Sequence, residues 1–425
     1  MSDFVESDED SHDSQETNCS GQDAAGVYSE LNADADEEPV DSTFDLTLPT
    51  SHSYLGNDLE DLRGRTILDN GVNVLPLLLQ HSVVLFPGQT LPMTVSDVET
   101  FNMLQKCILG NRTFGVCCLR MNEPVSIGTT AEIYQYTIAS EAQRFQIKAK
   151  GRQRFKILKV NSQGGSKTAY VKILPEETLG PANFDERLVS LDHLRVDPTN
   201  EKEAKLRNKL ERTEAAMTPF PAWVYRQYDA KRLSTKIRRY LHFIQKRGIN
   251  IPSDPMELSF WVAQNLVLDD NEKLALLSYN SAIPRLQKEI KYLINDKVLV
   301  CSHCNRFIGK RTDMFPMSKE GTQNTYCNPV GRIFDTVTLY TAEGLNFDGY
   351  PPSTEFSWFP GYAWIVVNCQ GCNIHMGWRF TAVEEDLKPA AFYGLVRKAL
   401  CFKKLNKDKN YNGNNGEDFQ PSSEF

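Results

Sequence analysis

Basic residues are missing from the first 62 positions of this 425-residue chain. That segment contains 18 Asp and Glu residues and no Lys or Arg, whereas the rest carries 47 bases against 37 acids. A block of like charge with few large apolar side chains cannot bury enough surface to offset its conformational entropy. The composition therefore predicts a disordered acidic tail over residues 1–59. It also argues against a signal or transit peptide, because both need basic residues near their start.

Long apolar runs are absent as well. A membrane-spanning helix requires roughly 18 consecutive apolar residues, and "NVLPLLL" is short and interrupted by Pro76. The ten cysteines lack the density of a secreted disulfide scaffold, so thiols and metal ligands in a reducing compartment are the better explanation. We expect no membrane span, and a cytoplasmic and nuclear location.

The segment after the tail is rich in strand and turn signals. Residues 73–95 consist of short apolar runs separated by prolines, and "TTAEIYQYTI" and "RFQIKAKGRQRFKILKV" alternate apolar and polar residues. Gly151, inside the last stretch, predicts a β-bulge. Together these segments predict a small antiparallel sheet that is closed or strongly curved. No aromatic stacking platform accompanies the basic side chains of the last strand, which favours a solvated face over a nucleic-acid surface.

The middle of the chain has helical periodicity. One apolar stripe comprises Leu206, Leu210, Thr213 and Met217, and a second comprises Leu233, Ile237, Tyr240, Leu241 and Ile244, followed by Gly248 as a C-cap. Asp254 and Asp269 are placed to cap two further helices. The aromatic segment "PFPAWVYRQYD" between the two stripes leaves room for a partner surface.

Two Cys-x-x-Cys pairs give the strongest chemical signal: Cys301 with Cys304, and Cys369 with Cys372. Four thiolates suit tetrahedral zinc, and this spacing lets both sulfur atoms of a pair reach one ion. Because 64 residues separate the pairs, we expect the ion to join the two ends of a sheet. Gly371 suits the tight backbone between two ligands. The pattern predicts one structural zinc ion with no open position for a catalytic water.

Other potential ligands are close to these pairs in sequence. His303 and His375 adjoin them, but histidines in such places are more often exposed neighbours than ligands. Cys327 and Cys401 have no partner at metal-binding spacing. We expect the first two to be spectators and the last two to be ordinary thiols.

Three of the five tryptophans, Trp358, Trp364 and Trp378, flank the second cysteine pair. Alternation around Trp364 predicts a strand leading into that pair, and Trp378 and Phe380 share one face of the strand leaving it. The spacing alone allows either a packed aromatic core or a ligand box. A box of three indoles would favour a cation, with Glu355 in support, or a flat and compact ring.

The first half of the ordered chain resembles the amino-terminal substrate-recognition domain of Lon proteases. The motifs that carry the resemblance are "LPLLLQHSVVLFPGQTLPM", "KGRQRFKI" and "SFWVAQNLVLDDNEKLALL", and they span roughly residues 60–296. A Lon protease would also need an ATPase and a peptidase. The sequence contains no G-x-x-x-x-G-K-[ST] loop, and residues 297–425 are too few for both modules.

The zinc pairs, the "NPVG" turn at Asn328, "PPSTEFSWFPGYAW" and "HMGWRF" together resemble the carboxy-terminal domain of the cereblon family. The same order of acidic tail, Lon-like domain and zinc domain identifies the chain as a member over residues 60–402. The fold class is thus α+β multidomain, with a Lon-like β-rich domain (60–296), a zinc-bound antiparallel β domain (297–403) and a polar tail (404–425).

The resemblance implies a non-catalytic substrate receptor of a cullin–RING ubiquitin ligase. A helical insertion at about residues 183–250 would bind the damage-specific DNA-binding adaptor protein. The zinc domain would bind cyclic imides, either thalidomide-type small molecules or carboxy-terminal cyclic imides on target proteins. The ligand-binding residues implied are Asn328, Phe356, Trp358, Trp364, Trp378 and Phe380, with Cys301, Cys304, Cys369 and Cys372 holding the zinc.

Phe356 departs from the family pattern, which usually has histidine at this position. One side-chain hydrogen bond to the ligand is then lost, at a cost of about 1 kcal/mol. Two other function classes remain open: a zinc-containing methionine sulfoxide reductase, which needs a reactive cysteine facing the pocket, and a methyl-lysine reader.

Overall fold

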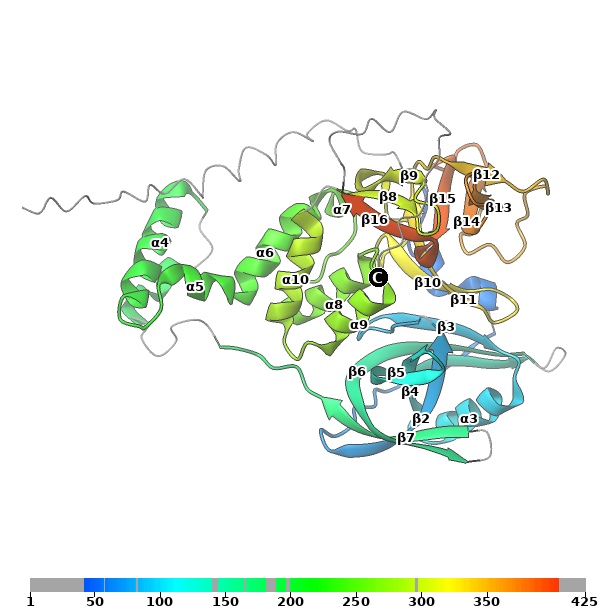
Figure 1. Cartoon of the computed structure of the whole chain (residues 1–425), viewed down its shortest axis with the longest axis horizontal. Coiled ribbons are helices and arrows are strands. Elements are labelled where there is room, and N and C mark those ends of the chain that lie inside the picture. Colours follow the sequence, from blue (N-terminus) through cyan, green and yellow to red (C-terminus); the bar gives the residue numbers. More distant parts are fainter. Residues whose placement is uncertain are drawn as a thin grey trace, which may run out of the picture. The chain divides into compact units, whose positions relative to one another are not determined.

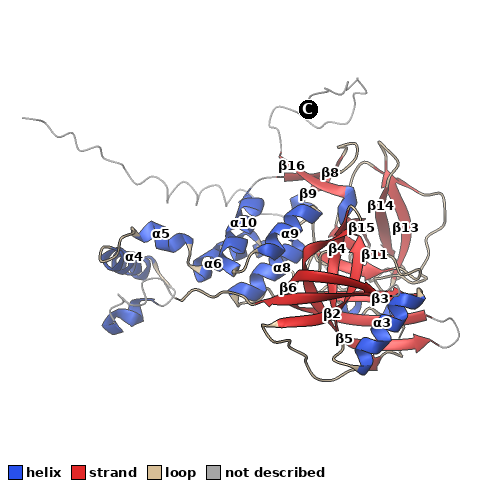
Figure 2. Cartoon of the chain, turned by 60° about the horizontal axis from the view of Figure 1, so that its bottom comes forward, coloured by secondary structure: helices blue, strands red, loops and turns tan. Residues whose placement is uncertain are grey.

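The computed structural model describes residues 42–56, 58–81, 83–139, 144–163, 166–180, 189–195, 199–294 and 297–404. All of them belong to one compact unit, Asp41–Phe425. The chain is an α+β protein in which most helices lie between two strand-rich parts along the sequence. In space, most of the helices lie to one side of the strands (Figure 2). Within the described part, no helix combines the length and apolarity needed to cross a membrane. The predicted polar tail lies outside the described residues from position 405 onward.

The first strand-rich part is a seven-stranded sheet in the order β1-β5-β4-β2-β7-β6-β3 (Figure 1). An additional pairing between β5 and β6 closes it into a small barrel. The strands are β1 (Glu60–Asp61), β2 (Val72–His81), β3 (Thr90–Val95), β4 (Thr113–Arg120), β5 (Glu123–Ala139), β6 (Arg144–Gln163) and β7 (Ser166–Leu174).

One pair of strands in this barrel differs from the expected antiparallel arrangement. Strands β2 and β4 run parallel, from Leu77 opposite Gly115 to His81 opposite Leu119. A parallel pair needs a crossover connection, and β3 with helix α3 (Val98–Leu109) provides it. Alternation of apolar residues along a strand does not encode its direction, so the sequence could not give this detail.

The bulge predicted at Gly151 is confirmed. The register between β5 and β6 shifts between Thr129 and Ala131, and Ala131 lies opposite Gly151. A Cβ atom at position 151 would lie 2.3 Å from the carbonyl oxygen of Phe86. Only glycine allows this approach of two backbones. Because of the bulge, strand β6 bends towards the segment before β3.

The predicted acidic tail ends too late, because residues 42–56 are ordered. They include helix α2 (Leu48–Ser51) and the 3₁₀ turn η2 (Ser53–Leu55), and Phe44 and Leu55 are 6% and 3% exposed. Apolar side chains such as these, with one acid among the fifteen residues, outweigh the charge argument locally. Residues 1–41 lie outside the described part.

Helices form the middle of the chain, as predicted. They are η3 (Val189–Arg195), α4 (Glu201–Ala215), α5 (Ala222–Gln227), α6 (Ala230–Tyr240), α7 (His242–Gln245), α8 (Pro255–Asn265), α9 (Asp270–Ser278) and α10 (Ala282–Ile294). Asp254 accepts hydrogen bonds from the first turn of α8, and Asp269 forms a capping box with Glu272 at α9. Helix α10 packs against α6 and α8, and their apolar faces meet Val84 and Phe86 of the segment between β2 and β3.

The carboxy-terminal part consists of two sheets. One has six strands in the order β10-β11-β15-β14-β13-β12, and the other has three in the order β16-β8-β9. Their bounds are β8 (Lys297–Cys301), β9 (Phe307–Lys310), η4 (Arg311–Asp313), β10 (Gln323–Cys327), β11 (Ile333–Leu339), β12 (Leu345–Phe347), β13 (Tyr362–Cys369), β14 (His375–Ala382), β15 (Ala391–Val396), η5 (Arg397–Ala399) and β16 (Leu400–Lys404).

A buried ion cluster connects the last helices with the six-stranded sheet. The carboxylate of Asp335 lies 3.3 Å from Lys273 Nζ and 3.2 Å from Arg397 Nε, and it also accepts a hydrogen bond from Thr325. Burial alone would raise the pKa of Asp335, but Lys273 and Arg397 outweigh that effect and lower it to about 2. The carboxylate therefore stabilises the fold fully above its usual pKa of about 3.9, and this contribution is lost as the pH falls towards 2.

We predict that Asp335→Asn destabilises the protein by about 3–5 kcal/mol, because Lys273 would lose its counter-ion in a dry interior. Chemical denaturation measured between pH 7 and about pH 2 checks this, and the variant should also lose part of the acid sensitivity of the wild type. Glu343→Gln, at an exposed position, is the control and should be nearly neutral. Equal stability of both variants would contradict the assigned role of the cluster.

Candidate functional site

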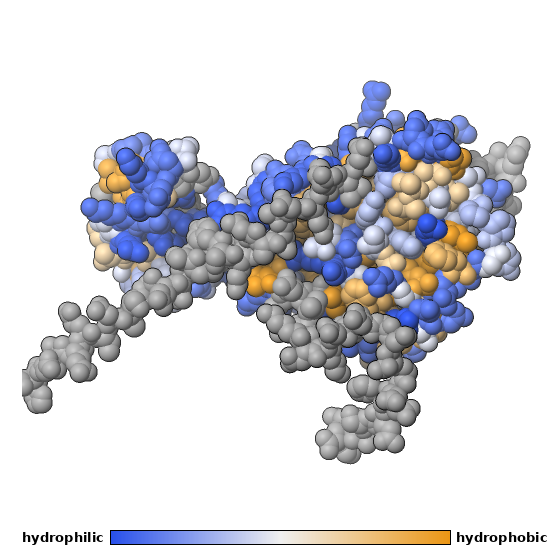
Figure 3. Space-filling view, turned by 90° about the horizontal axis from the view of Figure 1, so that it is seen from above, coloured by the Kyte–Doolittle hydropathy of each residue, from blue (hydrophilic) through white to orange (hydrophobic). Residues whose placement is uncertain are grey.

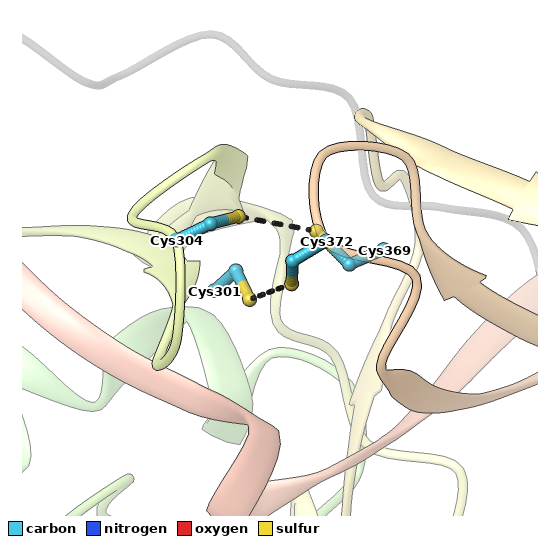
Figure 4. A group of neighbouring side chains, drawn as sticks. All are labelled: Cys301, Cys304, Cys369 and Cys372. Carbon is cyan, nitrogen blue, oxygen red and sulfur yellow. Dashed lines mark hydrogen bonds between the residues drawn. The ribbon is translucent and has the colours of Figure 1, made fainter. Parts of the chain in front are cut away.

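Four sulfur atoms converge at the junction of the two carboxy-terminal sheets (Figure 4). The Sγ atoms of Cys301 and Cys372 are 3.7 Å apart, and those of Cys304 and Cys369 are 3.5 Å apart. All four lie within 4.8 Å of one another. This compact set of thiols suits the tetrahedral coordination of one zinc ion. Cys301 ends β8 and Cys369 ends β13, so the cluster joins two different sheets. The expectation that it joins the two ends of one sheet was wrong.

The two cysteine pairs lie in hairpins with the same hydrogen bonds. In each, the first cysteine donates its N–H to the carbonyl of the residue five positions later, Arg306 or Ile374, over 2.8 Å. Its own carbonyl accepts from the N–H four positions later, which belongs to Asn305 or Asn373. Both asparagines have left-handed backbone, with φ of 63° and 58°. Asparagine tolerates this conformation well, and the shared motif C-x-x-C-N was a signal in the sequence that the spacing argument overlooked.

Local backbone groups also prepare the second pair for a metal ion. Burial would raise the pKa of Cys369, but the N–H groups of Cys372 and Gly371 point at its sulfur and lower the pKa to about 7. A thiolate is the form that binds zinc. A Cβ atom on Gly371 would lie 3.1 Å from Cys304 Sγ. The glycine predicted here therefore favours close approach of the two hairpins, and its φ is not positive.

Trp358 is the most enclosed of the three tryptophans, at 6% exposed. Its ring stacks on Tyr326 at 4.9 Å with an interplanar angle of 9°, and it meets Trp378 edge-on at 4.6 Å. The indole N–H donates to the carbonyl of Cys327 over 3.3 Å. Trp358 therefore belongs to the aromatic core and has only a small part of its surface exposed.

The register of β13 and β14 places Trp364 and Trp378 on one face of the sheet. Across β13 and β14, Trp364 lies opposite Phe380 and Trp378 lies opposite Val366, and directly opposed residues point to the same side. Both indoles are partly exposed, whereas Phe380 is 2% exposed and stacks on Phe392.

Trp364 forms no ring-to-ring pair with the other two indoles among the described residues. Its N–H donates to the carbonyl of Glu355 over 2.8 Å, and its partly exposed ring packs against the aromatic cluster that contains Trp358 and Phe380. All three tryptophans thus belong to one aromatic cluster, in which Trp364 and Trp378 are partly exposed and Phe380 is buried.

The two remaining predicted residues lie on turns beside these tryptophans. The side-chain oxygen of Asn328 accepts a hydrogen bond from the backbone N–H of Arg332 over 2.7 Å, and the side-chain nitrogen of Asn328 takes no part in this bond. Phe356 is 54% exposed and has a positive φ of 53°, an uncommon conformation for a bulky residue. Phe334, which the sequence did not single out, contacts both Trp378 at 5.1 Å and Trp358 at 5.9 Å.

Neither of the other two cysteines in this region is arranged as a nucleophile. Cys327 is fully buried, and burial raises the pKa of its thiol. Cys401 lies in β16, which pairs with β8 and is not part of the sheet that carries the tryptophans. Within the described residues, the only group of metal-binding side chains that includes a cysteine or histidine is the four-cysteine cluster.

Comparison with known proteins agrees with this architecture. Residues 74–295 match the family of the ATP-dependent protease La (LON) substrate-binding domain. Residues 297–415 match the family described as Yippee zinc-binding/DNA-binding/Mis18, centromere assembly. The zinc-binding description and the geometry of the four cysteines together confirm the prediction of one structural zinc ion.

Full-length relatives cover most of the chain. The protein named cereblon from Gallus gallus is 38% identical over 384 residues, which cover 86% of each chain. Cereblon from Danio rerio is 37% identical and covers 86% of this chain and 89% of that protein. Cereblon from Drosophila melanogaster is 32% identical over 397 residues, or 88% of this chain and 65% of that protein. The chain belongs to the cereblon family.

Proposed function

We propose that the chain is a non-catalytic substrate receptor of a cullin–RING ubiquitin ligase, and that its tryptophan box binds cyclic imides. The observation that carries the ligand assignment is that the three tryptophans belong to one aromatic cluster with the buried Phe380, in which Trp364 and Trp378 share a sheet face and are partly exposed. A flat and uncharged ring of imide size can be enclosed by three indole faces and can hydrogen-bond to nearby backbone groups. Asn328 and Phe356 would line the rim.

The zinc ion would hold this box rigid. Cys369 follows Trp364 on the same strand, and Cys372 precedes the strand that carries Trp378. Binding of the ion by Cys301, Cys304, Cys369 and Cys372 therefore fixes both indole-bearing strands against β8. When bound, the ion supplies structural stability only, because four protein ligands complete its coordination.

The two rival functions have weaker support. A sulfoxide reductase requires a thiolate facing the box, but Cys327 is buried with a raised pKa and Cys401 belongs to the other sheet. A methyl-lysine reader requires an anionic group against the cation. Glu355 is exposed, and it contacts the box through its backbone carbonyl, which accepts the N–H of Trp364.

The helical insertion offers a surface for the adaptor protein. Among the described elements, helix α4 packs mainly against η3 and α5. Its predicted apolar stripe is therefore only partly covered: Leu210 is 5% exposed, but Leu206 is 49% exposed. The following segment exposes Phe220 and Trp223 at 55% and 60%. Figure 3 shows a small hydrophobic patch on the otherwise largely hydrophilic lobe that α4 and α5 form. Exposed aromatic residues gathered on one segment are typical of a protein interface.

Zinc removal is the first test. We expect one zinc ion per chain, and we expect Cys369→Ala to unfold residues 297–403, because metal binding supplies folding free energy in such sites. Metal analysis and thermal melts measure both effects. Cys401→Ala, a thiol outside the cluster, should retain the ion, and a well-folded wild-type protein without zinc would contradict the assignment.

Tryptophan substitutions test the box. Trp364→Ala should abolish binding of a glutarimide ligand at a lower cost in stability than Trp358→Ala, because the Trp364 ring is partly exposed at the edge of the aromatic cluster. Trp358→Ala should also destabilise the fold by about 3–5 kcal/mol, since it removes a buried ring. Calorimetric titration with chemical denaturation separates the two effects. Trp223→Ala is the matched control, and glutarimide binding that survives in Trp364→Ala would count against the box.

A charge placed on the insertion tests the adaptor surface. Trp223→Asp should abolish capture of the adaptor and cullin without changing glutarimide affinity, because burying a carboxylate in an apolar interface is unfavourable. Leu109→Asp places the same charge on an apolar side chain that is 84% exposed on α3, and it should bind the adaptor normally. If Trp223→Asp still enters the ligase, the insertion is scaffold only.

A further inference from the structure

A cationic side chain stands beside the tryptophan box, on the turn that joins β10 and β11. Residues 328–332 close this turn with three hydrogen bonds: Asn328 N–H to the Arg332 carbonyl at 3.0 Å, Gly331 N–H to the Asn328 carbonyl at 2.9 Å, and Arg332 N–H to Asn328 Oδ1 at 2.7 Å. Cys327, just before the turn, accepts the indole N–H of Trp358. The turn is therefore fixed relative to one wall of the box.

Two contacts place the Arg332 guanidinium near the box. Its central carbon lies 5.2 Å from the centre of the Phe334 ring, and Phe334 in turn contacts Trp378 and Trp358. The ring of His375 lies 4.9 Å from that of Trp378, and His375 is close enough to Arg332 to be affected by its positive charge. Burial lowers the pKa of His375 first, and the positive charge of Arg332 lowers it further.

No acidic side chain in the described part of the chain forms an ion pair with Arg332, which is exposed. The other charged groups around the mouth are Asp348, whose carboxylate acts on His375 and accepts a hydrogen bond from Asn368, and Glu355 beside Trp364. Trp364 and Trp378 lie diagonally across β13 and β14. Of the charged groups named here, Arg332 is thus the cation without an ion pair, whereas the carboxylate of Asp348 already accepts a hydrogen bond from Asn368.

We propose that Arg332 is a specificity-determining residue of the box, and that it favours carboxy-terminal cyclic imides preceded by an acidic residue. This inference rests on the imide-binding function proposed above and names the class of target within it. Once the ring is enclosed, the preceding residue emerges at the mouth, where an unpaired guanidinium can bind a carboxylate through two parallel hydrogen bonds. The Phe334 ring supports the guanidinium from below.

The expected preference is modest because the pair would be exposed to solvent. Exposed ion pairs contribute about 0.2–1 kcal/mol, and the upper part of that range, about 0.4–1 kcal/mol, corresponds to roughly a two- to fivefold change in affinity. Screening by salt should reduce it further, since the Debye length is about 3 Å at 1 M ionic strength.

Calorimetry with two peptides tests the proposal on the full chain. Both end in the same carboxy-terminal glutarimide, and they differ only in Asp or Asn at the preceding position. Wild-type protein should bind the Asp peptide more tightly than the Asn peptide, and Arg332→Gln should reduce that ratio roughly two- to fivefold without changing affinity for the Asn peptide. The preference in the wild type should also shrink at about 1 M salt.

Glu355→Gln serves as the matched control of opposite charge, and its ratio should equal or exceed that of the wild type. A ratio that is unchanged in Arg332→Gln, or that falls equally in both variants, would overturn the role of Arg332 while leaving imide binding intact. Failure of both peptides to bind wild-type protein would instead overturn the proposed function, and this inference with it.

Discussion

Convergence of four sulfur atoms at the junction of two sheets is the constraint on which the carboxy-terminal half depends. Strand β8 brings Cys301 to the cluster, and the hairpin between β13 and β14 brings Cys369 and Cys372. Trp364 lies five residues before Cys369, and Trp378 lies six residues after Cys372. A change in the positions of the cysteines would therefore also displace both indoles, because only short, extended segments separate them. This explains why a structural metal ion is placed beside a candidate ligand site.

The aromatic face beyond the cluster combines a packed core with open walls. Trp358 belongs to the core by its burial and by its stacking on Tyr326, while Trp364 packs at the edge of the same aromatic cluster and is partly exposed. The spacing left open whether the tryptophans form a core or a box, and the three residues differ in this respect: Trp358 is buried, whereas Trp364 and Trp378 are partly exposed. Under the proposed function, Trp358 would serve both purposes, whereas Trp364 and Trp378 would be the partly exposed walls.

The sequence predicted chemistry better than it predicted direction and boundaries. Cysteine spacing, helix caps and strand alternation depend on neighbouring residues, so the four-sulfur cluster, Asp254, Asp269 and the faces of Trp364 and Trp378 could be inferred.

Other features depend on contacts between distant segments, and the sequence did not predict them. The parallel pairing of β2 with β4 is one, and the position of Phe334 against Trp378 is another. The order of residues 42–56 is a third, because Tyr54 accepts a hydrogen bond from the backbone of Cys327, 273 positions away. Charge and composition alone cannot reveal such a partner.

The most direct test of the account is a measurement on the five indole N–H groups, which give five separate signals in a nitrogen–proton correlation spectrum of the zinc-loaded protein. Addition of a glutarimide ligand should shift the signals of Trp358, Trp364 and Trp378, because the ligand would lie against all three rings. The signals of Trp223 and Trp261, which lie in α5 and α8, should not move. Shifts confined to Trp223 or Trp261, or no shift at all at saturating ligand, would contradict the account.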